Sequence, residues 1–172
     1  MRGAGKPHPL VSLARKAIAS HLSGNPPPQV EALEDPGEAA GAFVSLKKAG
    51  QLRGCIGTIQ PVRPTLAQEV LENAVSAATK DPRFQPITLE ELDEITISVD
   101  VLAAPEPVSG LEELDPSRYG VIVKSGWRKG VLLPDLPGIT TAEEQVRIAR
   151  QKAGIGEAET LELLRFEVKR YY

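Results

Sequence analysis

The sequence predicts a mixed fold in which antiparallel strands are flanked by helices. Three segments repeat apolar residues at the spacing of an amphipathic helix, and two pairs of strand-like segments are separated by short glycine-containing connections, as in hairpins. Residues 95–101 alternate strictly between apolar and polar side chains, which is typical of a strand with one buried face. The 172 residues suffice for one core, or for two small subdomains that share an interface.

The expected helices begin or end at recognisable signals. Proline is tolerated in the first turn of a helix, and a Thr followed three residues later by Glu or Gln caps the free N–H groups there. These signals predict helices over residues 9–22, from 65 to about 80 with a Thr65/Gln68 box, and from 140 to about 153 with a Thr140/Glu143 box. A further box, Thr88 with Glu91, predicts a short helix. Residues 25–41 are rich in proline and glycine, so we expect a loop there.

The expected strands are separated by connections that contain glycine or proline. They comprise residues 42–47 with a partner that ends at residue 59, residues 95–101, residues 120–124 with 130–133, and residues 160–172. Trp127 lies in the connection between residues 124 and 130, and we expect it to cover that hairpin. Stacking on the base or ring of a ligand is the alternative role of this side chain.

The composition excludes several classes of protein. Lys and Arg number 20 and Asp and Glu 23, and the net charge of −3 argues against a protein held on nucleic acid by phosphate contacts. Arg15 and Lys16 interrupt the apolar run near the N-terminus, so we expect neither a signal peptide nor a membrane span. One cysteine cannot form an internal disulfide, and the reducing cytoplasm is the expected location. His8, His21 and Cys55 lack the spacing of zinc ligands, and no metal or cofactor is predicted.

The segment LRGCIGT, residues 52–58, holds the single cysteine of the chain between Gly54 and Gly57. Glycine weakens a strand unless something approaches the backbone closely, so a ligand could reach Cys55 here. A thiol becomes a nucleophile only as the thiolate, which needs a nearby cation, a helix N-terminus or a histidine. The alternative interpretation is structural, because free cysteine is among the most buried residue types. The segment alone is compatible with both roles.

The turn DPRF, residues 81–84, follows the second expected helix, and Pro82 ends that helix. Arg83 carries the planar guanidinium that binds carboxylate or phosphate with two hydrogen bonds. Asp81 is close enough in sequence to be its structural partner instead. The sequence therefore leaves Arg83 with two roles, as a ligand-binding cation or as half of an internal ion pair.

Four segments occur in a characteristic order: GAFVSLKKAGQLRGCIGT, NAVSAATKDPRFQPIT, YGVIVKSGWRKGVLLPDL and RQKAGI. Through these the chain resembles the AMMECR domain family, whose prokaryotic members are called AmmeMemoRadiSam system protein A. The resemblance runs from about residue 10 to the C-terminus. It implies an α+β fold, with residues 1–172 as one domain of two intertwined subdomains around antiparallel strands, and with LRGCIGT lining the cleft between them. It also implies association with a Memo-type protein and a radical-SAM protein, but no particular reaction.

The leading functional hypothesis is a small cytosolic enzyme or enzyme subunit that acts on an anionic substrate in a cleft. Cys55 is its candidate nucleophile or thiol acceptor, and Arg53 or Arg83 would orient the anionic group. The expected substrate-binding residues are Arg53, Gly54, Gly57, Thr58, Asp81 and Arg83.

Two alternatives come from other functional classes. The chain could be a non-catalytic binding or scaffold module whose LRGCIGT segment docks a Memo-type or radical-SAM partner, because no catalytic triad, metal site or phosphate loop is evident. It could instead bind RNA or a nucleotide through Lys47, Lys48 and Arg53 together with the basic, aromatic residues 165–172. The near-neutral net charge argues against this second alternative.

Overall fold

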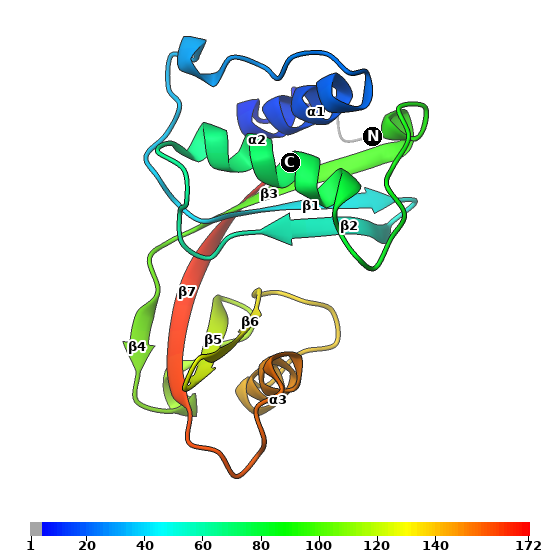
Figure 1. Ribbon diagram of the computed structural model, residues 1–172. Helices are drawn as coiled ribbons and strands as arrows, with labels where there is room; N and C mark the ends of the chain where they lie inside the picture. Colours follow the sequence, from blue (N-terminus) through cyan, green and yellow to red (C-terminus); the bar gives the residue numbers. More distant parts are fainter. Residues whose placement is uncertain (1–4) are drawn as a thin grey trace. The chain divides into compact units, whose positions relative to one another are not determined.

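The computed structural model describes residues 5–172 (Figure 1). The chain divides into two compact units. The first comprises the described residues up to Val101 together with Lys169–Tyr172, and the second comprises Leu102–Val168. Both units combine helices with antiparallel strands, so the predicted α+β class is confirmed.

The first unit packs two long helices on one face of antiparallel strands (Figure 1). Its elements are α1 (Pro9–Leu22), β1 (Ala42–Lys48), β2 (Gln51–Gly57), α2 (Leu66–Thr79) and β3 (Ile95–Leu102), with short 3-10 turns at Val30–Ala32 and Glu91–Glu94. Strand β1 is central, because it pairs with β2 through a hairpin and with β3 along its other edge.

The core of the first unit lies between these strands and the helices. Side chains alternate across a strand, and the apolar set of β1 and β3 faces α1 and α2. Val44 and Leu46 of β1 are fully buried, and so is Val99 of β3. Burial of a Val or Leu side chain of this kind stabilises the folded state by roughly 1.5–3 kcal/mol. The alanines of α2 at 74, 77 and 78 let this helix approach the strands closely.

The opposite face of the same strands carries polar side chains. Ser45 pairs directly with Cys55 on β2 and with Ser98 on β3, and Asp100 lies two residues further along β3. Asp100 is only 2% exposed, so this face includes a buried charge. Cys55 therefore lies on a polar face that α1 and α2 do not cover.

The second unit packs one long helix on a second group of antiparallel strands. Its elements are β4 (Glu106–Val108), a 3-10 turn at Leu111–Glu113, β5 (Tyr119–Ser125), β6 (Arg128–Leu132), α3 (Ala142–Ala153) and β7 (Glu162–Tyr171), whose last residues belong to the first unit. Strand β7 pairs with β4 and with β5, and β5 pairs in turn with β6. Val121, Val123 and Val146 are central to its apolar core.

Several of the predicted local signals are present in the structure. The hydroxyl of Thr65 accepts a hydrogen bond from the N–H of Gln68 at the start of α2. Pro9 occupies the first turn of α1, where the Nδ1 atom of His8 also accepts the N–H of Leu10 at 3.2 Å. Gly154 ends α3 with a φ of 67°, a left-handed conformation that glycine adopts without strain.

The structure also corrects the prediction in the second unit. The cap of α3 is Thr141 rather than Thr140, because the Thr141 hydroxyl accepts the N–H of Glu144. Strand β4 was not predicted, since its central residue, Pro107, removes a backbone donor and usually argues against a strand.

The connection between β5 and β6 is shorter than predicted. The strands extend to Ser125 and Arg128, so that a two-residue turn, Gly126 and Trp127, replaces the expected five-residue connection. The prediction that Trp127 covers the hairpin is wrong, because this side chain is 91% exposed at the tip.

Candidate functional site

Cys55 lies in the middle of β2, on the face that points away from α2. Its Sγ atom is 3.2 Å from the Oγ atom of Ser45, its direct cross-strand neighbour. The residue is half-buried rather than sealed in the apolar core. Cys55 therefore packs beside a polar neighbour and is not part of the apolar core of the first unit.

The glycines of LRGCIGT are required by packing within the protein. A Cβ atom added at Gly54 would lie 2.3 Å from the carbonyl oxygen of Ala77, so a larger residue would push α2 away from β2. A Cβ atom added at Gly57 would lie 2.2 Å from the ring of Phe43 on β1. The spacing of the two glycines therefore has an internal cause, which is independent of any approach by a ligand.

Asp81 connects the turn after α2 to the cysteine strand. Its Oδ2 atom accepts the backbone N–H of Cys55 at 3.0 Å. The same carboxylate accepts Nε and Nη2 of Arg83 at 3.0 and 2.8 Å, and also the backbone N–H of Arg83. The Asp81 side chain is 1% exposed and that of Arg83 is 55% exposed. A buried carboxylate therefore holds a cation whose outer part faces solvent, beside the Cys55 backbone.

The Asp81–Arg83 ion pair, which we call the clamp, and its surroundings shift the pKa values of Asp81, Arg83 and Cys55. Hydrogen bonds from Arg83 hold the pKa of Asp81 well below its usual range, and the same bonds raise the pKa of Arg83. Burial raises the pKa of the Cys55 thiol, and the negative charges of Asp100 and Asp81 act in the same direction. The hydrogen bond to Ser45 and the charge of Arg83 oppose this rise without cancelling it. Cys55 is consequently a neutral thiol at neutral pH.

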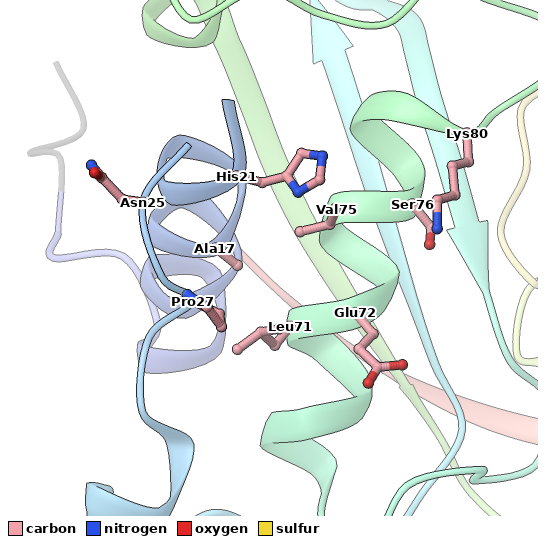
Figure 2. Close-up of a pocket in the computed structure, with 9 residues that line it drawn as sticks. All are labelled: Ala17, His21, Asn25, Pro27, Leu71, Glu72, Val75, Ser76 and Lys80. Atoms are coloured by element: carbon pink, nitrogen blue, oxygen red, sulfur yellow. The ribbon is translucent and has the colours of Figure 1, made fainter. Parts of the chain in front are cut away.

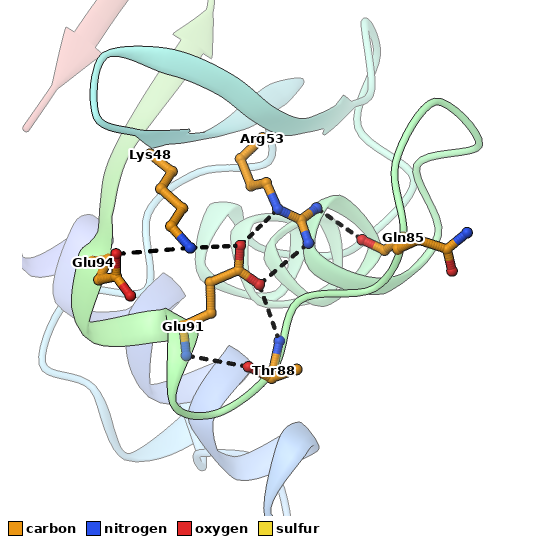
Figure 3. Close-up of polar contacts among 6 residues, drawn as sticks. All are labelled: Lys48, Arg53, Gln85, Thr88, Glu91 and Glu94. Atoms are coloured by element: carbon orange, nitrogen blue, oxygen red, sulfur yellow. Dashed lines mark hydrogen bonds and ion pairs between the residues drawn. The ribbon is translucent and has the colours of Figure 1, made fainter.

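Arg53 is engaged in a separate network, which Figure 3 shows. Its Nε and Nη2 atoms donate to the two carboxylate oxygens of Glu91 at 2.8 and 3.2 Å, and its Nη1 atom donates to the carbonyl of Gln85 at 2.8 Å. The Nζ atom of Lys48 lies 3.4 Å from the same carboxylate. Thr88 and Glu91 form the predicted capping box, in which each side chain accepts the backbone N–H of the other residue. Each guanidinium nitrogen of Arg53 already has an acceptor, so Arg83 is the better candidate for binding an anion.

Thr58, the last residue of the motif, belongs to a buried polar cluster. Its hydroxyl donates to Glu69 at 2.6 Å and accepts from the amide of Asn73 at 3.2 Å. Glu69 is 1% exposed and also accepts the backbone N–H groups of Val62 and Arg63. These contacts anchor the loop after β2 on α2. Sequence reasoning missed Glu69, although a carboxylate on the apolar face of a predicted helix was a usable signal.

Arg170 was predicted only as part of the basic C-terminal segment that could bind RNA, and the structure places it in an internal ion pair instead. It donates to both carboxylate oxygens of Asp100 at 2.7 and 2.9 Å, and its side chain is 29% exposed whereas that of Asp100 is 2% exposed. The arrangement repeats that of Asp81 and Arg83, with a buried carboxylate beneath a partly exposed cation. Asp100 lies close enough to Cys55 to influence its pKa. The thiol is therefore accompanied by two such ion pairs in the first unit.

Neither of the two histidines lies beside the Cys55 thiol. His21 lines a cavity of about 300 Å³ between α1 and α2, together with Glu72 and Lys80 (Figure 2). This cavity is on the helix side of the strands, whereas Cys55 is on the other side. His8 is held at the start of α1, where its ring stacks on Tyr171. Among residues 5–172 no three His, Cys, Asp or Glu side chains gather closely enough to hold a metal ion.

Comparison with known proteins supplies a family and a shared fold. The family model described as AMMECR1 matches residues 11–171. A protein of Thermotoga maritima is 58% identical over 134 residues, which cover 77% of this chain and 77% of that protein. A crystal structure of an uncharacterized protein from Pyrococcus horikoshii is 31% identical, with a TM-score of 0.83 over 94% of this chain and 88% of that one. This chain and the Pyrococcus protein share the same fold.

One relative is considerably longer than this chain. A protein of Clostridium acetobutylicum is 46% identical over 172 residues, which cover 95% of this chain but 36% of that protein. The corresponding segment is therefore part of a longer polypeptide there. No helix in the described part of the present chain is long and apolar enough to cross a membrane.

Proposed function

This chain belongs to the AMMECR1 family, and from that premise we propose that it is a small enzyme or enzyme subunit that binds an anionic group of its substrate at Arg83, beside the Cys55 thiol. One observation carries the proposal: the buried carboxylate of Asp81, which accepts the backbone N–H of Cys55, also fixes Arg83, whose side chain is 55% exposed. The lone reduced cysteine favours a cytoplasmic location for this function.

The geometry of the clamp leaves part of Arg83 for a ligand. Asp81 occupies Nε and Nη2, and Nη2 is also 3.5 Å from the carbonyl oxygen of Cys55. Within residues 5–172, Nη1 donates no hydrogen bond to another residue. Because the guanidinium is already oriented, little side-chain freedom is lost when a carboxylate or phosphate group binds. Phe84 also contacts the Arg83 guanidinium, because the centre of its ring is 5.4 Å from the guanidinium carbon.

The thiol contributes to this site as a neutral group. Its raised pKa keeps Cys55 protonated, and an anion bound at Arg83 would raise that pKa further by repulsion. Neither His8 nor His21 lies on this face to act as a base. We therefore assign the thiol a role in contacting the ligand, and we expect any base for nucleophilic attack to come from the substrate or a partner. The Memo-type and radical-SAM partners implied by resemblance remain predictions.

Anion binding can be tested by NMR with inorganic phosphate and citrate as probes. We expect both probes to shift the backbone amide signals of Cys55 and Arg83 in a saturable manner. The substitution Arg83→Gln should weaken binding by at least about tenfold, because it removes a charge-assisted hydrogen bond. Arg63→Gln is the matched control, since Arg63 is similarly exposed and pairs with Glu72 in the same unit. Absence of saturable shifts, or equal binding by Arg83→Gln, would refute the proposal.

The folding of the test variant can be controlled separately. Arg83→Gln leaves the Asp81 carboxylate buried without its cation, which can destabilise the unit. The double variant Asp81→Asn with Arg83→Gln removes both charges and retains hydrogen-bonding side chains. It should fold and still fail to bind phosphate or citrate, whereas retained binding would exclude the assigned site.

A further inference from the structure

The tip of the β5–β6 hairpin presents an isolated aromatic side chain. Trp127 is the only tryptophan of the chain and is 91% exposed. The turn places it there because Gly126 adopts a φ of 60°, which reverses the chain within two residues. The indole has no part in the apolar core of the second unit, so folding does not explain its presence.

Unpaired cations accompany this indole. Lys124 and Lys129 are direct cross-strand neighbours next to the turn, and neither forms an ion pair within residues 5–172. Arg128 is different, because its guanidinium binds Glu159 and the carbonyl of Gly154. Two lysines of like charge are therefore neighbours next to the turn, and the other cross-strand neighbour of Lys124 is Glu162 on β7, with which it forms no ion pair in the described residues.

An exposed ring in a turn next to two cations complements an anion that itself carries a planar ring. Aromatic side chains stack on bases of any sequence, and lysines contact the phosphates on either side. Insertion into a membrane would require more apolar area, yet Trp127 is the only apolar side chain from Ser125 to Lys129. We propose that this hairpin tip binds single-stranded nucleic acid, with one base stacked on Trp127 and adjacent phosphates at Lys124 and Lys129.

This inference is independent of the anion site at Arg83. The hairpin belongs to the second unit, whereas Arg83 and Cys55 belong to the first. It also differs from binding through Lys48 and Arg53, which are paired with Glu91. The net charge of −3 limits long-range attraction, so the predicted contact is short and sensitive to salt.

The single tryptophan reports directly on this contact. Addition of a ten-nucleotide oligouridine to the full chain at low salt should quench the Trp127 fluorescence in a saturable manner. Inorganic polyphosphate of equal charge should quench it much less, because it has no rings to stack. Absence of quenching by oligouridine, or equal quenching by polyphosphate, would overturn the proposal. A blue shift with phosphatidylglycerol vesicles but no response to oligouridine would identify a membrane contact instead and overturn it too.

Variants test the two components separately, with the anisotropy of fluorescein-labelled oligouridine as the measurement. Trp127→Ala should weaken binding by at least about fivefold, the loss expected for one stacked base. The double variant Lys124→Gln with Lys129→Gln should weaken binding and reduce the salt slope by about 1.4. The control is Lys6→Gln with Lys16→Gln, an equal change of charge on exposed lysines of the first unit. Equal effects of the control pair, or unchanged binding by Trp127→Ala, would refute the assignment.

Discussion

The backbone N–H of Cys55 donates a hydrogen bond of 3.0 Å to the buried carboxylate of Asp81. The same carboxylate accepts two hydrogen bonds from the Arg83 guanidinium. A single buried charge therefore positions both β2 and the group that we propose binds an anion. Because Asp81 follows α2 and Cys55 lies on β2, this contact also ties a helix end to the sheet. The stability of the unit and the geometry of the site therefore depend on the same residue.

Asp81→Asn should lower the free energy of unfolding by about 1–3 kcal/mol, because a buried charge-assisted network loses its negative charge and one of its two acceptor oxygens. Urea unfolding monitored by circular dichroism measures this change. Asp93→Asn, an exposed residue of the same unit, is the control and should change stability by less than about 0.5 kcal/mol. Equal stability of the two variants would show that the clamp contributes nothing to folding.

The same residue should influence stability at acid pH. The pKa of Asp81 is lower in the folded than in the unfolded protein, so its contribution is complete above the ordinary Asp pKa of about 3.9. The contribution disappears as the pH falls through the lower pKa of the folded state. The stability difference between the wild type and Asp81→Asn should therefore shrink below about pH 4. A difference that stays constant down to pH 2 would contradict this assignment.

Gly54→Ala should destabilise the protein by about 1–3 kcal/mol or more, the usual effect of overpacking. The added methyl group would lie 2.3 Å from the carbonyl oxygen of Ala77 and would displace α2. Thermal unfolding provides the measurement. Gly5→Ala is a matched control, because a Cβ atom there meets no atom within 4 Å. If Gly54→Ala were as stable as this control, the packing explanation for the motif would have to be abandoned.

Cys55 should react with iodoacetamide more slowly than free cysteine at neutral pH, because burial raises its pKa and reduces the thiolate fraction. The rate should increase with pH along a titration curve displaced to higher pH than that of the free amino acid. Mass spectrometry of the single cysteine gives the rate at each pH. A reaction faster than that of free cysteine below pH 8 would reveal a stabilised thiolate and restore the nucleophile hypothesis.

Glu69→Ala should destabilise the first unit by at least about 2 kcal/mol, because it leaves several donors without an acceptor. The donors are the Thr58 hydroxyl and the N–H groups of Val62 and Arg63. Glu72→Ala is the control, since Glu72 is exposed on the same helix. Hydrogen exchange should also accelerate at Val62 and Arg63 in Glu69→Ala only. Unchanged exchange there would mean that Glu69 does not anchor this loop.

The local signals of the sequence predicted the elements well but not the partners of the charged residues. The Thr65 cap and the alternation of β3 depend on neighbours within a few residues, and both are present. Arg53 was a candidate for substrate binding, yet it is committed to Glu91, 38 positions away. Arg170 was a candidate only as one of the basic residues 165–172, because the carboxylate that it binds lies 70 positions away on β3. The spacing of apolar residues within one segment cannot predict ion pairs between residues so far apart in the sequence.

The sequence by itself determined the helices, the hairpins, the family resemblance and the position of a lone thiol within a glycine-flanked strand, because these depend on local geometry and on short motifs. Only the tertiary structure decided what surrounds that thiol. Packing against Ala77 and Phe43 accounts for the two glycines, and burial keeps the thiol neutral. The tertiary structure also decided which arginine is the better candidate for anion binding, because it pairs Arg53 with Glu91 and Arg83 with Asp81. Burial and charge pairing are properties of the folded chain, and they determine which of its polar residues remain free to bind a ligand.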